Sequence, residues 1–399
     1  MTGAAASPTG MQPLAGVTVI DFTQVMMGPC ATQMLADYGA DVIKIERPGA
    51  GDLSRSSVPD PDGLDNPVFR SLNRNKRSIA LDLRGEKGKA VVHDLVRKAD
   101  VVVNNFRAGV MERMGFGYAD LAKINPRIIC AFGSGFGQTG PLAHKGGQDV
   151  LAQALSGVMA RRSDESLPLS IYPTALADYS AGMHLVQGIL LALLQRERTG
   201  VGQQISVSLY DSMLAMQMQE AAMHLQRERD LNWGAFPLSG VFPTGDSALV
   251  LVGAFKANPL QDICRALDLP DLSAEPRHAT FDEQVKTKAE LHAHFRRRFA
   301  SNTTAYWLGR LDKEDLLCAP VQSLADALAS EQTAVNGMIV SYDGEKPMKL
   351  IGSPIGMTSG AFRLRRLPPR LGEHGEDVLR ELGYDERRIA ALRAEKVLS

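Results

Sequence analysis

The sequence predicts an α/β protein, in which a parallel sheet with helices on both faces forms a large domain and a smaller α/β domain follows. Three observations support this fold class. The 399 residues exceed the usual size of one domain. In the first third of the chain, short β-branched runs alternate with helical patterns, as is typical of parallel sheets. Near Trp233 the pattern changes, and a second group of elements begins.

The elements of the large domain follow from hydrophobic periodicity. Apolar runs predict strands at 17–22, 41–45, 78–83, 101–103, 127–132 and 203–208. Helical patterns predict helices at 30–38, 86–98, 179–198 and 211–229. Ligands bind at the carboxyl ends of the strands in such sheets. We therefore expect the chemistry in the loops after Phe22, Ile45, Val103 and Phe132.

The chain is expected to divide into a tail, two domains and a returning segment. Residues 1–12 are small and polar and lack the charged and apolar regions of a signal peptide, so they predict a disordered tail. The large domain is expected at 13–230 and the small α/β domain at 240–330, with a strand at 248–253. Residues 345–399 are expected to return to the large domain.

Composition excludes several classes of protein. The net charge of −1 argues against a nucleic-acid or membrane-surface protein, which normally carries a basic excess. Four cysteines lie far apart without a CxxC pair, which disfavours a disulfide framework or a zinc site and fits a reducing compartment. The longest apolar stretch, near 185–194, is too short to span a bilayer. We expect a cytoplasmic protein without a metal.

A glycine-rich segment at 133–140 follows a predicted strand. Its pattern is GxGxG rather than the GxGxxG of dinucleotide-binding loops, and Pro141 intervenes before any helix. A structural or substrate-lining loop is therefore favoured over a nicotinamide site. The sequence also lacks a Walker A motif, HExxH and GxSxG.

Two aspartates stand where predicted helices begin. Asp178 precedes the long helix, and Asp149 precedes a shorter one. An N-cap is the commoner role of such a residue. An N-cap role is compatible with a role as a nucleophile, because a helix N-terminus also holds a carboxylate ionised. Small residues around Asp178 would let a ligand approach, so Asp178 is also a candidate nucleophile.

A series of short blocks is more specific than any single motif. They lie at 13–17, 21–23, 28–29, 35–46, 73–78, 104–107, 134–137, 197–203, 319–321, 352–355 and 371–374. In this order they resemble the class III CoA-transferase family of the CaiB/BaiF type, which includes formyl-CoA transferase and crotonobetainyl-CoA:carnitine CoA-transferase. The likeness runs from about Pro13 to the C-terminus.

The resemblance implies a Rossmann-like large domain and a homodimer of two interlocked, ring-like subunits. It also implies that Asp178 is the nucleophile: its carboxylate forms a mixed anhydride with the acyl group and then an aspartyl-CoA thioester, which an incoming carboxylate attacks. Backbone N–H groups at the helix start are suited to stabilise the oxyanions. The exchange conserves the thioester, so no ATP site is needed. Asp149 receives a supporting role.

The resemblance also implies a coenzyme A site. Arg47 and Arg113 should meet the phosphates, while Leu81, Asn105 and Phe106 should line the groove for adenine and pantetheine. Gln24 and Met26 should lie near the thioester. Additional cations are expected from Lys76, Arg77 and Lys145.

Two departures from formyl-CoA transferases bear on specificity. Those enzymes carry glutamine at the position of Met26 and a tetraglycine loop where this chain has residues 232–240. Both departures disfavour formyl or oxalyl groups, and Met26 favours a different or larger acyl group.

Three other functions compete. The α-methylacyl-CoA racemases share the fold, but their catalytic histidine falls at Gln148, which cannot take up a proton at neutral pH. A non-catalytic CoA-binding protein would not need Asp178 and Asp149. A nicotinamide-dependent dehydrogenase would need the missing glycine fingerprint.

Overall fold

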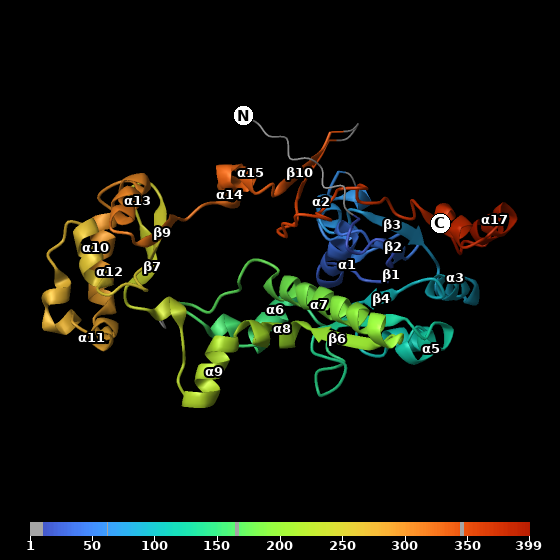
Figure 1. Ribbon diagram of the computed structural model, residues 1–399, viewed down its shortest axis with the longest axis horizontal. Coiled ribbons are helices and arrows are strands. Elements are labelled where there is room, and N and C mark those ends of the chain that lie inside the picture. Colours follow the sequence, from blue (N-terminus) through green and yellow to red (C-terminus); the bar gives the residue numbers. More distant parts are fainter. Residues whose placement is uncertain (1–10, 62, 164–166, 344–346) are drawn as a thin grey trace. The chain divides into compact units, whose positions relative to one another are not determined.

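A computed structural model of the protein describes residues 11–61, 63–163, 167–343 and 347–399. Its larger unit is built on a six-stranded sheet in which every neighbouring pair of strands is parallel (Figure 1). In the order β3-β2-β1-β4-β5-β6, the strands are Lys76–Ala80, Asp41–Glu46, Thr18–Asp21, Val101–Asn104, Ile129–Ser134 and Gln204–Ser208. The prediction of an α/β protein with a parallel sheet is confirmed.

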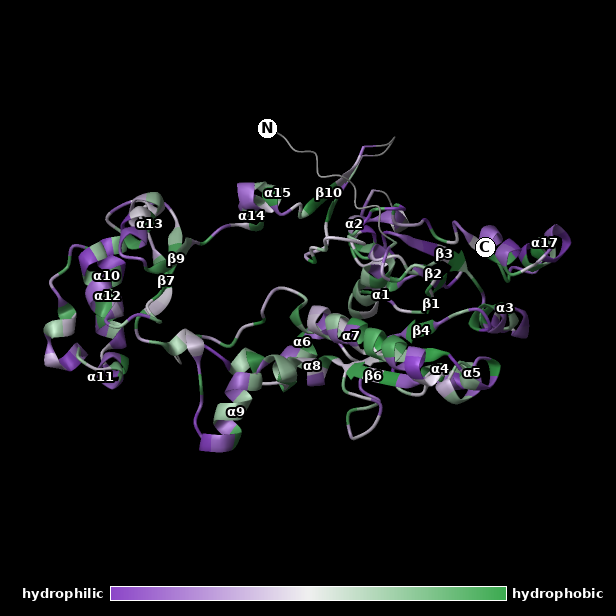
Figure 2. Ribbon diagram, in the orientation of Figure 1, coloured by the Kyte–Doolittle hydropathy of each residue, from purple (hydrophilic) through white to green (hydrophobic). Residues whose placement is uncertain are grey.

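Helices cover both faces of this sheet. On one face lie α1 (Met27–Asp37), α6 (Asp149–Leu155), α7 (Leu176–Thr199) and α8 (Leu209–Met216). On the other lie α3 (Glu86–Val96), α4 (Val110–Met114), α5 (Tyr118–Ile124), α16 (Gly375–Glu381) and α17 (Glu386–Ala394). Alternate strand residues supply the two cores: in β1, Val19 packs with α1 and α7, whereas Ile20 packs with α3. Figure 2 shows α7 and β6 as largely hydrophobic and α17 as largely hydrophilic.

Helix α7 lies against α1 through a glycine. A Cβ atom at Gly182 would stand 2.7 Å from the Met27 carbonyl oxygen and 2.8 Å from the Cys30 sulfur. No larger residue fits there without moving one helix, so the two backbones approach closely. The first turn of α7, one turn before Gly182, is thereby held beside the loop that follows β1.

Helix α7 is also long and apolar enough to cross a membrane, with a mean hydropathy of 1.2. From the sequence, we expect the longest apolar stretch to be too short to span a bilayer. Judged by length and composition only, α7 is long enough. This is weak support for a membrane span, because core helices of globular proteins meet the same criterion and 44% of the apolar window is buried.

The second unit comprises the described residues within 160–170 and 219–335. Its sheet is antiparallel, in the order β7-β8-β9, with strands Ser239–Pro243, Ala248–Val252 and Leu317–Pro320. Its helices are α9 (Met218–Arg227), α10 (Pro259–Ala266), α11 (Phe281–Lys286), α12 (Lys288–Phe299), α13 (Thr304–Lys313), α14 (Leu324–Ala329) and α15 (Glu331–Val335). Aromatic side chains, among them Phe242, Phe295 and Trp307, fill its core. Sequence patterns indicated only the middle strand.

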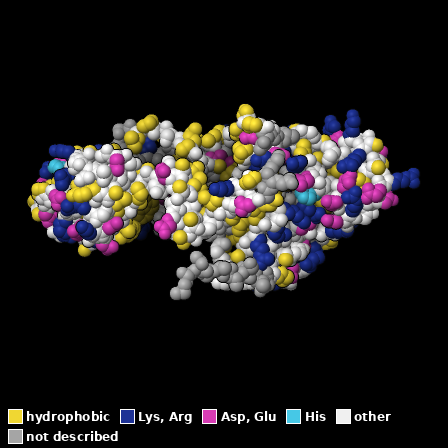
Figure 3. All heavy atoms as spheres, turned by 90° about the horizontal axis from the view of Figure 1, so that it is seen from above, with side chains coloured by type: hydrophobic (Ala, Val, Ile, Leu, Met, Phe, Trp, Pro, Cys, Tyr) yellow, Lys and Arg dark blue, Asp and Glu magenta, His cyan; other side chains and the backbone are white. Residues whose placement is uncertain are grey.

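The larger unit consists of the described residues within 1–159, 171–218 and 336–399. Besides the main sheet it contains α2 (Pro67–Arg70) and an antiparallel hairpin of β10 (Ile339–Tyr342) and β11 (Met348–Ile351). The predicted tail at 1–12 lies mostly outside the described residues. On the face seen in Figure 3, Lys and Arg side chains are interspersed with Asp and Glu.

Two helices differ from their predicted bounds. Helix α1 begins at Met27 rather than at 30, because Pro29 lies in the first turn, where a proline needs no hydrogen bond. The single helix predicted at 211–229 is interrupted at Gln217, which caps α8. Helix α8 buries Leu209 and Met213, whereas α9 buries no residue.

Candidate active site at the carboxyl edge of the sheet

Two cavities open at the carboxyl ends of the strands. One, of about 410 Å³, is lined by the loops after β1, β4 and β5 and by the first turn of α7. Of the residues singled out from the sequence, it contains Gln24, Met26, Asn105, Phe106, Lys145 and Asp178. The other, of about 1070 Å³, contains Arg47, Leu81 and Arg113. Gln24 and Phe106 line both cavities, so the two meet there.

Asp178 lies in the third position of α7, not at its N-cap, which is Ala175. The N-cap interpretation of Asp178 is therefore wrong. Burial, followed by the nearby negative charge of Asp149, raises the pKa of Asp178 to about 6, although the Met27 backbone N–H donates to it. At neutral pH the carboxylate remains mostly ionised, and it is a stronger base than an exposed aspartate.

Asp149 caps α7 rather than its own helix, whose N-cap is Gln148. Its Oδ1 accepts the backbone N–H groups of Ala177, at 2.6 Å, and of Asp178, at 3.0 Å. Its Oδ2 accepts from Gln153 Nε2 at 2.6 Å. The N–H groups of this helix start are thus already used. They are not free for an oxyanion, contrary to expectation.

The loop after β1 is held in a strained conformation by buried charges. Val25 has a φ of 69°, a left-handed backbone that costs a β-branched residue about 1–2 kcal/mol. Its N–H donates to Asp52 Oδ1 at 2.9 Å, and Asp52 pairs with the buried Lys44 at 2.7 Å. Lys44 also donates to the Thr23 carbonyl at 2.7 Å. This pair anchors the loop that carries Gln24 and Met26.

The loops after β1 and β4 are also joined directly. The Gln24 N–H donates to Asn105 Oδ1 at 2.8 Å, and Asn105 Nδ2 donates to the Gln24 carbonyl at 2.7 Å. Asn105 therefore lines the cavity and fixes its neighbour at the same time.

The cations fall into two groups. Among the described residues, the side chains of Arg47, Arg113 and Lys145 have no ion-pair partner. Lys76 is fully buried and bonds Asp21, while Arg77 bonds Asp41 and Glu381. The expectation that Lys76 and Arg77 supply further ligand cations is wrong, because both neutralise carboxylates of the larger unit.

The glycine-rich segment has a packing role. Ser134 and Gly135 line the smaller cavity. A Cβ atom on Gly135 would lie 2.4 Å from the Cα atom of Gly147, so two loops touch there through their backbones. No helix starts directly after the segment, so it offers no phosphate cradle of the dinucleotide-binding kind.

Asp178 thus lines a cavity that meets a second, cationic cavity at Gln24 and Phe106. The family model for CoA-transferase family III matches residues 14–375. The chain belongs to this family. The resemblance noted in the sequence is confirmed.

Similar proteins include several CoA-transferases. Mouse succinyl-CoA:glutarate CoA-transferase is 36% identical over 390 residues, covering 96% of this chain and 89% of the mouse protein. Acetyl-CoA:oxalate CoA-transferase of Acetobacter aceti is 36% identical over 395 residues, covering 96% and 98%. The crystal structure of a CaiB/BaiF family protein from Brucella suis has a TM-score of 0.84 at 31% identity, covering 93% of this chain and 99% of that one.

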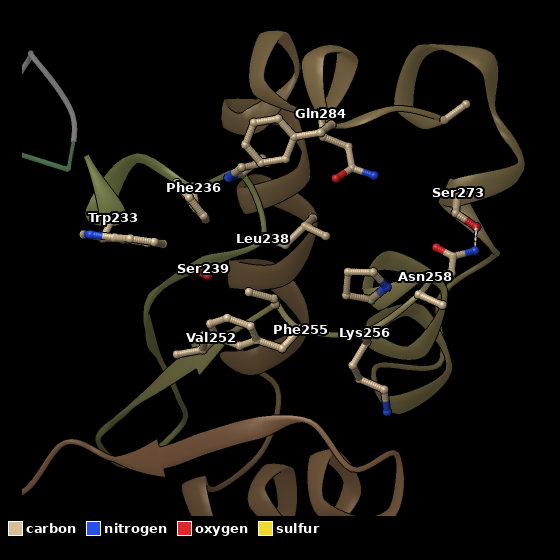
Figure 4. A pocket seen from close by; sticks show the side chains of 17 residues that line it. Trp233, Phe236, Leu238, Ser239, Val252, Phe255, Lys256, Asn258, Ser273 and Gln284 are labelled. Atoms are coloured by element: carbon tan, nitrogen blue, oxygen red, sulfur yellow. Dashed lines mark hydrogen bonds between the residues drawn. The ribbon is translucent and has the colours of Figure 1, made fainter. Parts of the chain in front are cut away.

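The smaller unit of this CoA-transferase has a cavity of its own, of about 760 Å³ (Figure 4). The aromatic side chains of Trp233, Phe236 and Phe255 line it. The rings of Trp233 and Phe236 make this part of the lining bulky and apolar. Among the described residues, no group of three or more His, Cys, Asp or Glu side chains is placed to hold a metal ion.

Sequence reasoning did not find several residues that shape this candidate site. Lys44 and Asp52 support the β1 loop, and Arg107 and Lys396 line the two cavities. A charged residue inside an apolar strand, as Lys44 is, was the one available signal for the buried pair. Lys396 gave none, because a lysine near a chain end is normally a solvated residue.

Replacing Asp149 separates its two roles. Asp149→Ala removes the acceptor of two N–H groups and is expected to lower the free energy of unfolding by about 1–2 kcal/mol. Asp149→Asn retains an acceptor oxygen and should cost less. Urea denaturation of both variants measures this difference, and equal costs would contradict the capping role.

Proposed function

We propose that this CoA-transferase moves CoA from an acyl-CoA thioester to a small carboxylic acid through covalent intermediates on Asp178. One observation carries the proposal: the half-buried Asp178 carboxylate lines a cavity that meets, at Gln24 and Phe106, a second cavity with unpaired cations. A long anionic thioester could place its sulfur beside Asp178 and its phosphates among Arg47 and Arg113.

The proposed reaction runs through two anhydrides and one thioester. An Asp178 oxygen attacks the thioester carbonyl, the C–S bond breaks, and CoA leaves as a thiolate. The thiolate attacks the aspartyl carbonyl, which breaks the anhydride and releases the donor acid as a carboxylate. The acceptor carboxylate then attacks the aspartyl thioester and expels the thiolate again. Attack of this thiolate on the acceptor carbonyl forms the new acyl-CoA and restores Asp178.

Each of these steps develops a negative oxygen that needs a donor. The N–H groups of Ala177 and Asp178 are occupied by Asp149. Among the described residues, the N–H groups of Gly146 and Gly147 have no hydrogen-bond partner, and both glycines line the cavity. We therefore assign stabilisation of the oxyanion to the N–H groups of this loop rather than to those at the start of α7.

The acceptor is proposed to be a small dicarboxylic acid. Arg107 and Lys145 both line the cavity around Asp178 and have no ion-pair partner among the described residues. One carboxylate would react while the second pairs with Arg107, whose planar group suits a carboxylate. The similar proteins are named for glutarate and oxalate, which agrees with this class of acid.

A racemase mechanism has less support. The position of the racemase histidine is Gln148, which lines the same cavity. A neutral amide there cannot shuttle the α-proton of an acyl-CoA. A binding protein without turnover would have no use for a carboxylate whose pKa is raised to about 6 beside that cavity.

We also propose a cytoplasmic homodimer with interlocked subunits. Leu191 and Leu194 on α7 are 67% and 55% exposed, so part of this apolar helix is available to a partner. All four cysteines are free thiols, which suits a reducing compartment.

Asp178→Asn is expected to lower the rate of CoA exchange at least 1000-fold. Its free energy of unfolding at pH 7 should rise by about 1 kcal/mol, because the variant buries no charge at this position. Wild-type protein given an acyl-CoA and hydroxylamine should yield a hydroxamate at Asp178, detected by peptide mass spectrometry. Asp120→Asn is the matched control, since Asp120 holds the same third position in α5 and lines neither cavity. Residual exchange above one per cent would refute the assignment.

Activity should depend on pH through Asp178. Its carboxylate must be ionised, so kcat/KM for the acyl-CoA is expected to fall below a pKa of about 6 and to level off above about pH 7. Asp149→Asn removes a negative charge that raises this pKa, so its profile should shift to lower pH. Steady-state rates between pH 5 and 8 measure both profiles, and two identical profiles would contradict the coupling.

Arg107→Met tests the acceptor class. We expect KM for glutarate to rise about tenfold, the cost of one charged hydrogen bond. KM for butyrate, which lacks the second carboxylate, should not change. A similar rise for both acids would show that Arg107 does not recognise the distal carboxylate.

A further inference from the structure

The end of the chain forms part of the larger cavity. Glu395 and Lys396 line it together with Arg47 and Arg113. Two hydrogen bonds attach this end beside β3: the Asp82 N–H donates to the Val397 carbonyl at 2.9 Å, and the Ser399 N–H donates to the Ala80 carbonyl at 3.2 Å. Together they form an antiparallel bridge between Leu81 and Leu398. Leu398 is buried. The position of Lys396 is therefore fixed by its neighbours.

Lys396 occupies a backbone position that normally belongs to glycine. It follows α17 with a φ of 58°. The Lys396 N–H donates to the Arg393 carbonyl, and the Val397 N–H donates to the Leu392 carbonyl, both at 2.9 Å. These bonds define the helix ending that usually carries glycine in its left-handed position. The backbone of Lys396 is therefore held in one conformation at the border of the larger cavity.

Among the described residues, Lys396 has no ion-pair partner. Other cations around the larger cavity do: Arg84 pairs with Asp82 and Lys89 pairs with Glu86. Of the cations that line this cavity, Arg47, Arg113 and Lys396 pair with no carboxylate in the described part of the chain. Three unpaired cations around one cavity are suited to a ligand with several phosphates.

The strand order assigns these cations to different parts of such a ligand. Asp178 lies with the loops after β1, β4 and β5. Arg47 follows β2, the neighbour of β1, whereas the chain end pairs with residues 80–82, at the carboxyl end of the edge strand β3. Of the three unpaired cations, Lys396 is thus the one farthest from Asp178 in strand order. In CoA, the 3′-phosphate on the ribose is farther along the molecule from the sulfur than the diphosphate is.

We infer that Lys396 binds the 3′-phosphate of coenzyme A and makes the enzyme discriminate CoA from its 3′-dephospho form. The inference rests on the proposed CoA site, and it adds the residue that reads this phosphate. The chain end then contributes to the binding site, in addition to pairing with residues 80–82.

Calorimetric titration with free CoA and with 3′-dephospho-CoA tests this without turnover. Lys396→Gln and Lys396→Gly are expected to weaken CoA binding about tenfold and to leave 3′-dephospho-CoA binding unchanged. Lys396→Arg should bind both ligands like wild type. Lys123→Gln, which removes a surface cation outside both cavities, is the matched control and should change neither affinity.

The glycine variant guards against a folding artefact, because glycine adopts the left-handed backbone without strain. Its thermal stability should equal or exceed that of wild type. If both neutral variants bind CoA as wild type does, or lose CoA and 3′-dephospho-CoA affinity equally, the assignment to the 3′-phosphate is overturned. If wild-type protein binds neither ligand, the CoA site itself fails. Binding of CoA with no Asp178 adduct would instead reject only the proposed chemistry.

Discussion

The arrangement of the site depends on one carboxylate that accepts two backbone N–H groups. Asp149 Oδ1 bonds the N–H groups of Ala177 and Asp178, and so joins the start of α6 to the start of α7. Helix α7 packs closely against α1 at Gly182, and the Met27 N–H donates to Asp178, so the first turn of α7 lies against the β1 loop. The same contact places a negative charge beside Asp178, where it helps raise the pKa. The Asp149 carboxylate therefore both positions the first turn of α7 and raises the basicity of Asp178.

The loop after β1, which borders Asp178, combines features that are unfavourable one by one. The left-handed Val25 and the burial of Lys44 and Asp52 are both unfavourable taken alone. Together they compensate, because Asp52 accepts the Val25 N–H and neutralises Lys44. Such a loop has few alternative conformations. A loop held in one conformation beside Asp178 helps to position the carboxylate oxygen for attack on the thioester carbonyl carbon.

Sequence reasoning was most accurate where periodicity is strong. The predicted strand at 41–45 and the helix beginning at Glu86 lie close to β2 and α3, since apolar runs and caps are local signals. It was least accurate where partners are distant. Asp149 and Asp178 both looked like N-caps of their own helices, yet Asp149 caps the other helix from 29 residues away. Lys76 looked like a ligand cation, yet it is buried against Asp21.

The sequence by itself determined the α/β class, the family and several of the residues at the carboxyl edge of the sheet, Asp178 among them, because these follow from local patterns and ordered blocks. Only the tertiary structure decided which N–H groups remain free, which cations remain unpaired and how the chain end enters the larger cavity. Those properties depend on contacts between residues far apart in the chain, as between Asp82 and Val397. Local patterns contain no information about such distances.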